Sequence, residues 1–174
     1  MDEQDFERLV TLYYPRIRRA ALLLSEGKEW DADDLAHETI LQAARSWSRF
    51  SGRSQEMTWL YSILLNQHRR RRRSARRLWR RWLGWLERKP GDESSGVPEH
   101  KLVAEEWSTS LWNAVGLLPE AQRETVVLRF AEELSYEDIG RVLGCPVGTV
   151  KSRLHHALAT LQQSLNEHEM HSPG

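Results

Sequence analysis

Residues 134–161 read LSYEDIGRVLGCPVGTVKSRLHHALATL, and this stretch decides the fold of the carboxy-terminal part of the chain. Ser135 stands three residues before Asp138, the spacing of a capping box with Asp in place of the usual Glu or Gln, so a short helix is expected from there to Leu143. The turn Gly144-Cys145-Pro146 ends that helix. A second helix starts at Val147, and the pair predicts a helix-turn-helix.

The second helix of this motif has one apolar face and one polar face. Spacing assigns the inward face to Val147, Val150, Leu154, Ala157 or Leu158, Leu161 and Leu165. The polar face begins near the amino terminus of the helix, where a helix in the DNA major groove meets base edges and phosphates, and it holds Thr149, Lys151, Ser152, Arg153, His155 and His156. The plainer alternative is a helical hairpin with a solvated face, but the clustered Thr, Lys, Ser and Arg favour DNA binding.

Apolar residues recur at three-and-four spacing over most of the remaining chain. Helices are expected from Phe6 to Leu24 with a bend or an interruption at Pro15, and from Asp31, whose side chain can cap the next helix. Another runs from Trp59 into the arginines at 69–73, and two more precede the helix-turn-helix. No strand-like alternation persists. The predicted fold class is all-α, with two small helical domains joined by a flexible linker, the carboxy-terminal one containing the helix-turn-helix.

The expected domain boundaries follow from these helices. Residues 1–75 form the first domain, residues 76–105 a basic Trp-rich segment and linker, and residues 106–174 the helix-turn-helix domain with a carboxy-terminal tail. Residues 90–99 hold almost no large apolar side chain and have the composition of a flexible linker.

Several function classes are excluded by composition. The 174 residues contain one cysteine, Cys145, so no internal disulfide or CxxC zinc site is expected. The amino terminus is acidic, and the longest apolar run, Ala20 to Leu24, is far below the ~20 residues of a membrane span, so we expect a cytoplasmic protein without stable membrane insertion. No HExxH, phosphate loop or nucleophile elbow occurs. We therefore expect no enzyme, catalytic residue, metal or cofactor; His168 and His171 are read as part of a mobile tail.

Opposite charges are segregated along the chain. Residues 68–89 carry 11 basic and 1 acidic residues, residues 1–67 carry 8 and 11, and residues 90–174 carry 6 and 13. Such a basic zone attracts polyanions. Its arginines could contact phosphates while Trp79, Trp82 and Trp85 stack on unpaired bases; it could lie on an anionic membrane; or it could extend a solvated helix whose tryptophans dock on the protein.

Four stretches together carry a family resemblance. Residues 143–158 (LGCPVGTVKSRLHHAL) and 118–130 (LPEAQRETVVLRF) resemble the −35-reading domain of bacterial sigma-70 family initiation factors, in particular the small extracytoplasmic-function (ECF) group. Residues 31–39 (DADDLAHET) resemble the family's polymerase-binding helix, and residues 59–66 (WLYSILLN) its promoter-melting helix. The resemblance implies a sigma factor that binds core RNA polymerase and promoter DNA, with an anti-sigma factor as a further partner.

The resemblance also assigns roles to residues. Polymerase binding falls on Asp31, Asp33, Asp34, Leu35 and Glu38. Recognition and melting of the −10 element fall on Ser54, Gln55, Glu56, Met57, Trp59, Tyr61, Asn66, Arg69 and Arg70. The residues alone leave simpler alternatives open: first-turn acids that cap a helix, an ordinary connection at 51–57, and aromatic side chains in the core.

Two positions depart from the family pattern. His37 stands where the family usually has Gln, which puts little in doubt, and His156 stands where it usually has Arg. Loss of that permanent charge predicts a weaker or differently specific −35 contact. Alternative functions are a stand-alone helix-turn-helix regulator, which would bind its operator without polymerase, and a peripheral membrane or RNA-binding protein that uses residues 68–89.

Overall fold

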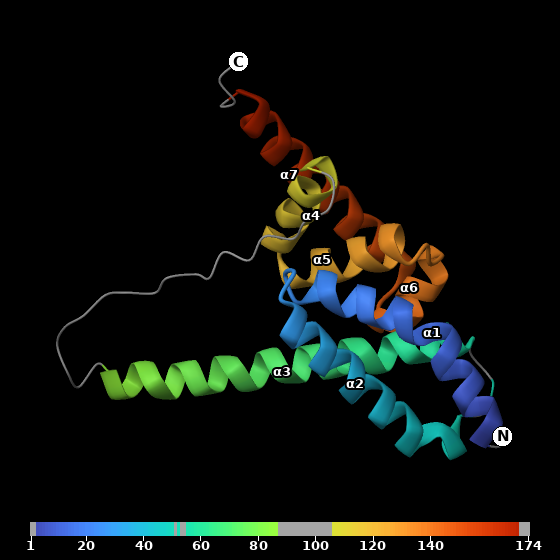
Figure 1. Cartoon of the computed structure of the whole chain (residues 1–174). Coiled ribbons are helices and arrows are strands. Elements are labelled where there is room, and N and C mark those ends of the chain that lie inside the picture. The colour runs from blue at the N-terminus through green and yellow to red at the C-terminus, as the bar shows by residue number, and fades with distance from the viewer. Residues whose placement is uncertain (1–2, 51, 53–54, 87–105, 171–174) are drawn as a thin grey trace.

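The computed structural model describes residues 3–50, 52, 55–86 and 106–170, and these are helical apart from turns (Figure 1). The helices are α1 (Glu3–Leu24), α2 (Glu29–Ser46), α3 (Glu56–Leu86), α4 (Glu106–Leu117), α5 (Glu120–Val126), α6 (Tyr136–Leu143) and α7 (Val147–Met170), with a 3-10 turn η1 (Trp47–Arg49) and a π-helical turn η2 (Val127–Ala131). The all-α prediction is confirmed. None of the described helices combines the length and apolar character that a membrane span needs.

The amino-terminal half packs α1, α2 and α3 around an apolar core. Leu9 and Ile17 of α1, Leu35 of α2, and Leu60 and Leu64 of α3 are each at most 1% exposed. These residues recur at helical spacing, so each helix buries one stripe against its neighbours.

Two details of this half differ from the sequence-based expectation. Pro15 does not interrupt α1, which continues from Glu3 to Leu24, because the packed stripes on both sides of the proline hold the helix together despite one missing backbone donor. Helix α2 begins at Glu29 rather than Asp31. Lys28 is its N-cap and no side chain caps it; the first backbone bond runs from the Ala32 N–H to the Lys28 carbonyl.

The carboxy-terminal half contains the predicted helix-turn-helix, formed by α6 and α7. Ser135 Oγ accepts a hydrogen bond from the Asp138 N–H at 3.0 Å, as the capping box requires. Gly144 ends α6 at φ 65°, a left-handed conformation that favours glycine. Gly140 is also constrained, since a Cβ there would lie 2.9 Å from the Cys145 carbonyl oxygen. Of the two alternatives for one inward position, Ala157 takes it and is fully buried, while Leu158 is 48% exposed.

The turn η2 precedes the helix-turn-helix and has wider backbone winding than an α-helix. The Glu132 N–H donates to the Val127 carbonyl at 3.2 Å and the Leu134 N–H to the Leu128 carbonyl at 3.0 Å, so the winding spans five and six residues instead of four. Glu133 follows at φ 56°. The wide turn directs Glu132 toward α1.

The two halves lie against each other. Helix α1 contacts η2 and α4, and α3 contacts α6. Figure 1 shows α1 between α3 on one side and the α5–α6 region on the other, with the far end of α3 projecting away from the body. The boundary expected at residue 75 falls inside α3, which continues to Leu86. The linker expected at 90–99 lies outside the described residues.

Candidate nucleic-acid interface and the contact between the halves

Four of the six polar residues predicted for the outward face of α7 are exposed. Lys151, Ser152, His155 and His156 are exposed at the start of the helix, and Thr149 is half-buried beside them. Lys151 Nζ lies 5.7 Å from the centre of the Tyr136 ring. An amphipathic helix with a cationic, exposed first half has the geometry that major-groove reading needs.

Arg153 differs from the rest of this face. It is half-buried and its Nη1 lies 3.8 Å from Cys145 Sγ. Its guanidinium also lines a hollow between the halves, beside arginines of α3. Arg153 therefore faces the amino-terminal half in this conformation.

Five of the residues expected at the −10 element are exposed or half-buried at the surface. Gln55, Asn66 and Arg70 are exposed, and Glu56 and Met57 are half-buried; Ser54 lies outside the described residues. Asn66 and Arg70 line a hollow of about 330 Å³ together with Gln42, Ser46, Ile63 and Gln67. The Gln67 side chain is 8% exposed, and its buried Oε1 has no hydrogen-bond partner within the part of the chain that the structure describes. This hollow thus offers an unused acceptor beside amide and guanidinium donors.

Two aromatic residues expected at the −10 element, Trp59 and Tyr61, pack in or against the core, whereas the side chains of Trp79, Trp82 and Trp85 lie outside the described residues. Tyr61 is fully buried, and Trp59 is half-buried with its ring 4.7 Å from Phe50 and 5.9 Å from Trp47. Tyr61 cannot reach a base in this conformation. The alternative interpretation, an aromatic side chain in the core, describes it.

The acidic residues of α2 form ion pairs with their own half. Asp33 accepts from Arg18 Nε at 2.6 Å, and this bond raises the pKa of Arg18. Glu38 accepts from Arg71 Nε at 2.8 Å, and Asp34, 63% exposed, lies 3.6 Å from the same guanidinium. Asp31 is exposed. Leu35 is a correction to the expected surface, because its side chain is 1% exposed and belongs to the core.

Glu132 joins the two halves from a fully buried position. Its carboxylate accepts from Arg16 Nε at 3.3 Å, from Arg19 Nη2 at 3.1 Å and from the Tyr61 hydroxyl. Burial and then the hydrogen bond to Glu132 raise the pKa of Tyr61 well above its usual value. All three donors belong to the amino-terminal half. Glu132, which directly follows η2, therefore binds both α1 and α3.

Further charged contacts cross the same boundary at Glu124 and Arg123. Glu124 of α5, 1% exposed, accepts a bidentate pair from Arg69 at 2.9 and 2.6 Å, which raises the pKa of Arg69. Arg123, 4% exposed, donates to Glu26 at 2.6 Å and to the Leu24 carbonyl at 3.3 Å. Burial alone would raise the pKa of Glu26, but the bond and charge of Arg123 leave it lowered. Arg69, which was expected to act in promoter melting, is thus bound to a carboxylate of the other half.

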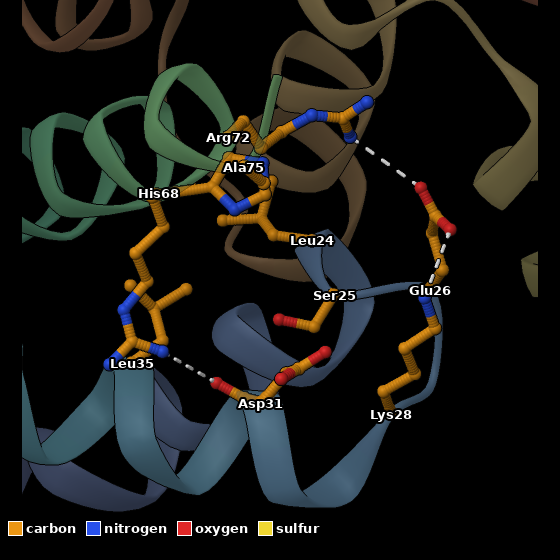
Figure 2. Close-up of a pocket in the computed structure, with 10 residues that line it drawn as sticks. Leu24, Ser25, Glu26, Lys28, Asp31, Leu35, His68, Arg72 and Ala75 are labelled. Atoms are coloured by element: carbon orange, nitrogen blue, oxygen red, sulfur yellow. Dashed lines mark hydrogen bonds and ion pairs between the residues drawn. The ribbon is translucent and has the colours of Figure 1, made fainter. Parts of the chain in front are cut away.

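Figure 2 shows the cavity at the turn between α1 and α2, about 380 Å³ in volume, where His68 and Arg72 of α3 face Glu26 and Lys28. Burial, followed by the charge of Arg72, lowers the pKa of His68 to about 4. His68 is therefore neutral near pH 7. Its ring nitrogen and the carboxylates of Glu120 and Glu124 offer atoms within 4.8 Å of one another.

This His68 cluster does not suit a cation. Glu124 is paired with Arg69, and Glu120 lies 3.7 Å from both Arg72 and Arg76. A metal ion would have to displace three guanidinium groups from the two carboxylates. The cluster is an ion-pair network.

Glu124 and Glu132 are functional candidates that sequence reasoning missed. The only signal was indirect: charged residues near the apolar run at 126–128, and an acidic carboxy-terminal part that complements the basic zone at 68–89. Part of that acidity holds the basic helix, since Glu124 pairs with Arg69 and Glu120 lies beside Arg72 and Arg76.

Comparison with known proteins matches both halves. Residues 9–78 match the family described as Sigma-70 region 2, and residues 108–161 match Sigma-70, region 4. The ECF RNA polymerase sigma factor EcfG of Rhodopseudomonas palustris is 35% identical over 87% of this chain and 80% of its own length. The ECF RNA polymerase sigma-E factor of Haemophilus influenzae is 28% identical over 94% of this chain and 89% of its own.

The chain belongs to the ECF group of the sigma-70 family. It is an RNA polymerase sigma factor, a class of non-enzymatic transcription initiation factors. A solved structure agrees: the sigma factor RpoE of Bartonella quintana, in complex with the anti-sigma factor NepR, superposes with a TM-score of 0.76 at 29% identity, over 94% of this chain and 98% of that one.

Proposed function

We propose that this sigma factor divides promoter recognition between its halves and lends specificity to RNA polymerase without a reaction of its own. The exposed cationic start of α7 reads the −35 element through Lys151, Ser152, His155 and His156, joined by Thr149 and Arg153. The start of α3 acts at the −10 element. The observation that carries the proposal is the outward polar face of α7, the second helix of a capped helix-turn-helix.

At the −10 element, the hollow beside Gln67 supports capture of an unpaired base. The buried, unpartnered Gln67 Oε1 can accept from the exocyclic amine of adenine or cytosine, while Asn66 and Arg70 supply donors at the rim. Substitution Gln67→Leu should change which base is preferred at −10, whereas Arg70→Gln should weaken binding to all sequences alike. Equal losses on every −10 variant from Gln67→Leu would remove the reading role.

Promoter binding requires the halves to separate. The −35 and −10 elements lie roughly 25 base pairs apart, which is about 85 Å at 3.4 Å per base pair. Arg69 and Arg153 instead line one hollow of about 260 Å³. The conformation described is therefore a closed form, and the open form binds the promoter.

Polymerase binding is proposed for the exposed acids of α2. Asp34 is 63% exposed, and Asp34→Arg should impair assembly with core polymerase because it replaces an attraction with a repulsion. Glu7→Arg is the matched control, an exposed acid of α1 in the same half. Co-elution with core polymerase on gel filtration is the measurement, and equal co-elution of both variants would contradict this assignment.

The test of the whole proposal is run-off transcription with core polymerase on a promoter pool. The full chain should select specific promoters, and Arg153→Ala should lose selection at −35 by ~1–3 kcal/mol. Operator binding by the chain alone, with no effect of polymerase, would instead identify a stand-alone regulator.

We extend the proposal to an anti-sigma protein, as in the Bartonella complex. Both halves expose apolar side chains that a partner could cover, among them Trp30 at 82%, Leu12 at 60%, Leu117 at 86% and Phe130 at 53%. Such a partner should compete with core polymerase for the chain. Simultaneous binding of both in a co-elution assay would overturn this extension.

A further inference from the structure

Five arginines from both halves converge on one hollow of about 260 Å³. Arg69, Arg72, Arg73 and Arg76 come from α3, and Arg153 comes from α7. Glu120 and Glu124 of α5 complete the charged lining. The arginines outnumber the glutamates by three, so the hollow carries a net positive charge.

The two carboxylates are already committed to three of these arginines. Glu124 holds Arg69 through two bonds of 2.9 and 2.6 Å, and Glu120 lies 3.7 Å from Arg72 and from Arg76. Arg73 and Arg153 have no carboxylate partner among the residues that the structure describes. One unpaired guanidinium therefore stands on each side of the boundary between the halves.

Like charges that meet in a partly enclosed space attract a multivalent anion. Guanidinium groups bind phosphate oxygens in bidentate pairs, and a phosphate chain can present oxygens to both walls at once. The volume equals that of eight or nine water molecules at about 30 Å³ each, enough for several linked phosphates.

We infer that this hollow is a binding site for a phosphate-chain anion, carried either by inorganic polyphosphate or by a nucleotide, which bridges Arg73 of α3 and Arg153 of α7. Because the anion contacts both halves only when they are together, it stabilises the closed form by mass action. The binding itself does not depend on the proposed function. Its effect on promoter binding rests on that function, since DNA phosphates would compete for the same arginines.

The experiment is calorimetric titration of the free full-length chain with tripolyphosphate, in 0.15 M salt to screen weak surface attraction. We expect one saturable site. Arg73→Gln and Arg153→Gln should each weaken binding at least threefold, and the double variant at least tenfold. Arg70→Gln, an exposed arginine of the same helix that lines a different hollow, is the charge-matched control and should change binding less than twofold.

Each outcome decides the inference. No saturable site, or equal weakening by Arg70→Gln, means non-specific attraction and overturns it. Loss with Arg73→Gln alone overturns the bridge between the halves. Arg153→Lys keeps the charge and should retain part of the affinity, which separates a lost contact from a misfolded variant.

Two further arms identify the source and the specificity. Titration with GTP compares a nucleotide with the bare chain: tighter binding assigns the site to nucleotides, and equal or weaker binding assigns it to inorganic polyphosphate. Orthophosphate and sulfate should bind at least tenfold more weakly, and equal binding of either would overturn the requirement for a chain. No polymerase or DNA is present, so a failure of the proposed sigma activity would leave these results unchanged.

Discussion

The interior of each half and the contact between the halves are built from different chemistry. Inside the amino-terminal half, Leu35 and Leu64 are fully buried among apolar neighbours, and Ile139 and Val150 play the same part in the carboxy-terminal half. Between the halves, the most deeply buried side chains include Arg123, Glu124 and Glu132, exposed by 4%, 1% and 0%. One chain thus contains an apolar type of burial and a charged type.

The difference matters because the two kinds of surface respond differently to water. Exposing buried apolar surface to water costs about 25 cal/mol of free energy for each Å². A buried ion pair recovers much of its desolvation cost when it separates and hydrates. We therefore expect each half to stay folded while the charged contact between them opens. Four variants or conditions test this contrast.

The largest effect is expected inside a half. Leu64→Ala removes a fully buried side chain from α3 and should lower the free energy of unfolding by ~2–5 kcal/mol. Urea denaturation followed by circular dichroism measures this loss. A cost below about 1 kcal/mol would mean that this half is not the tightly packed unit described.

Acid should weaken the fold through His68, which is 6% exposed beside the charged contact. Its pKa is lowered to about 4 in the folded chain, so between pH 6.5 and 4 the unfolded chain binds the extra proton. Stability should therefore fall as pH drops through that window, by up to about 3 kcal/mol. His68→Gln should flatten the pH profile of unfolding; an unchanged profile would assign the loss to other groups.

At the contact, Glu132→Gln keeps the shape of the side chain but removes its charge. Arg16, Arg19 and Tyr61 lose their anionic acceptor, so closure should weaken by ~1–3 kcal/mol while the helical content stays constant. Small-angle X-ray scattering should report a larger radius of gyration. Glu137→Gln, an exposed acid of α6, is the control; equal expansion by both variants would refute a specific role for Glu132.

The smallest effect is expected at an exposed ion pair within one half. Arg71→Ala breaks pairs with Glu38 and Asp34, whose side chains are 44% and 63% exposed. Such pairs contribute about 0.2–1 kcal/mol. The same denaturation assay measures this contribution. A loss above 2 kcal/mol would show that exposed ion pairs stabilise the chain as much as buried ones.

The sequence predicts those parts of the structure that depend on neighbouring residues. Ser135, Asp138 and Gly144 define the helix-turn-helix through contacts over a few positions, and the structure agrees. The edge of a helical stripe is less well defined by spacing, which is why spacing alone left Ala157 and Leu158 as alternatives for one inward position. The start of α2 at Glu29 depends on a backbone bond that no side chain signals.

Patterns among neighbouring residues do not predict the contact between the halves. Arg69 and Glu124 are 55 residues apart, and Tyr61 and Glu132 are 71 apart. Complementary net charges indicate attraction between two segments, but they do not say which guanidinium meets which carboxylate. The same limit explains why Leu35 and Tyr61 were expected at a surface: the motif resemblance identifies a helix, not which of its side chains face inward.

The wide turn η2 has an evolutionary consequence. An α-helix advances about 100° per residue, so loss of a single residue from Val127–Ala131 would rewind the segment and swing Glu132 to another side of the helix axis. Every side chain of the buried cluster would remain encoded, yet the carboxylate would no longer meet Arg16, Arg19 and Tyr61. One in-frame codon deletion would then yield a descendant whose halves are no longer held together by Glu132. One codon insertion would restore that contact.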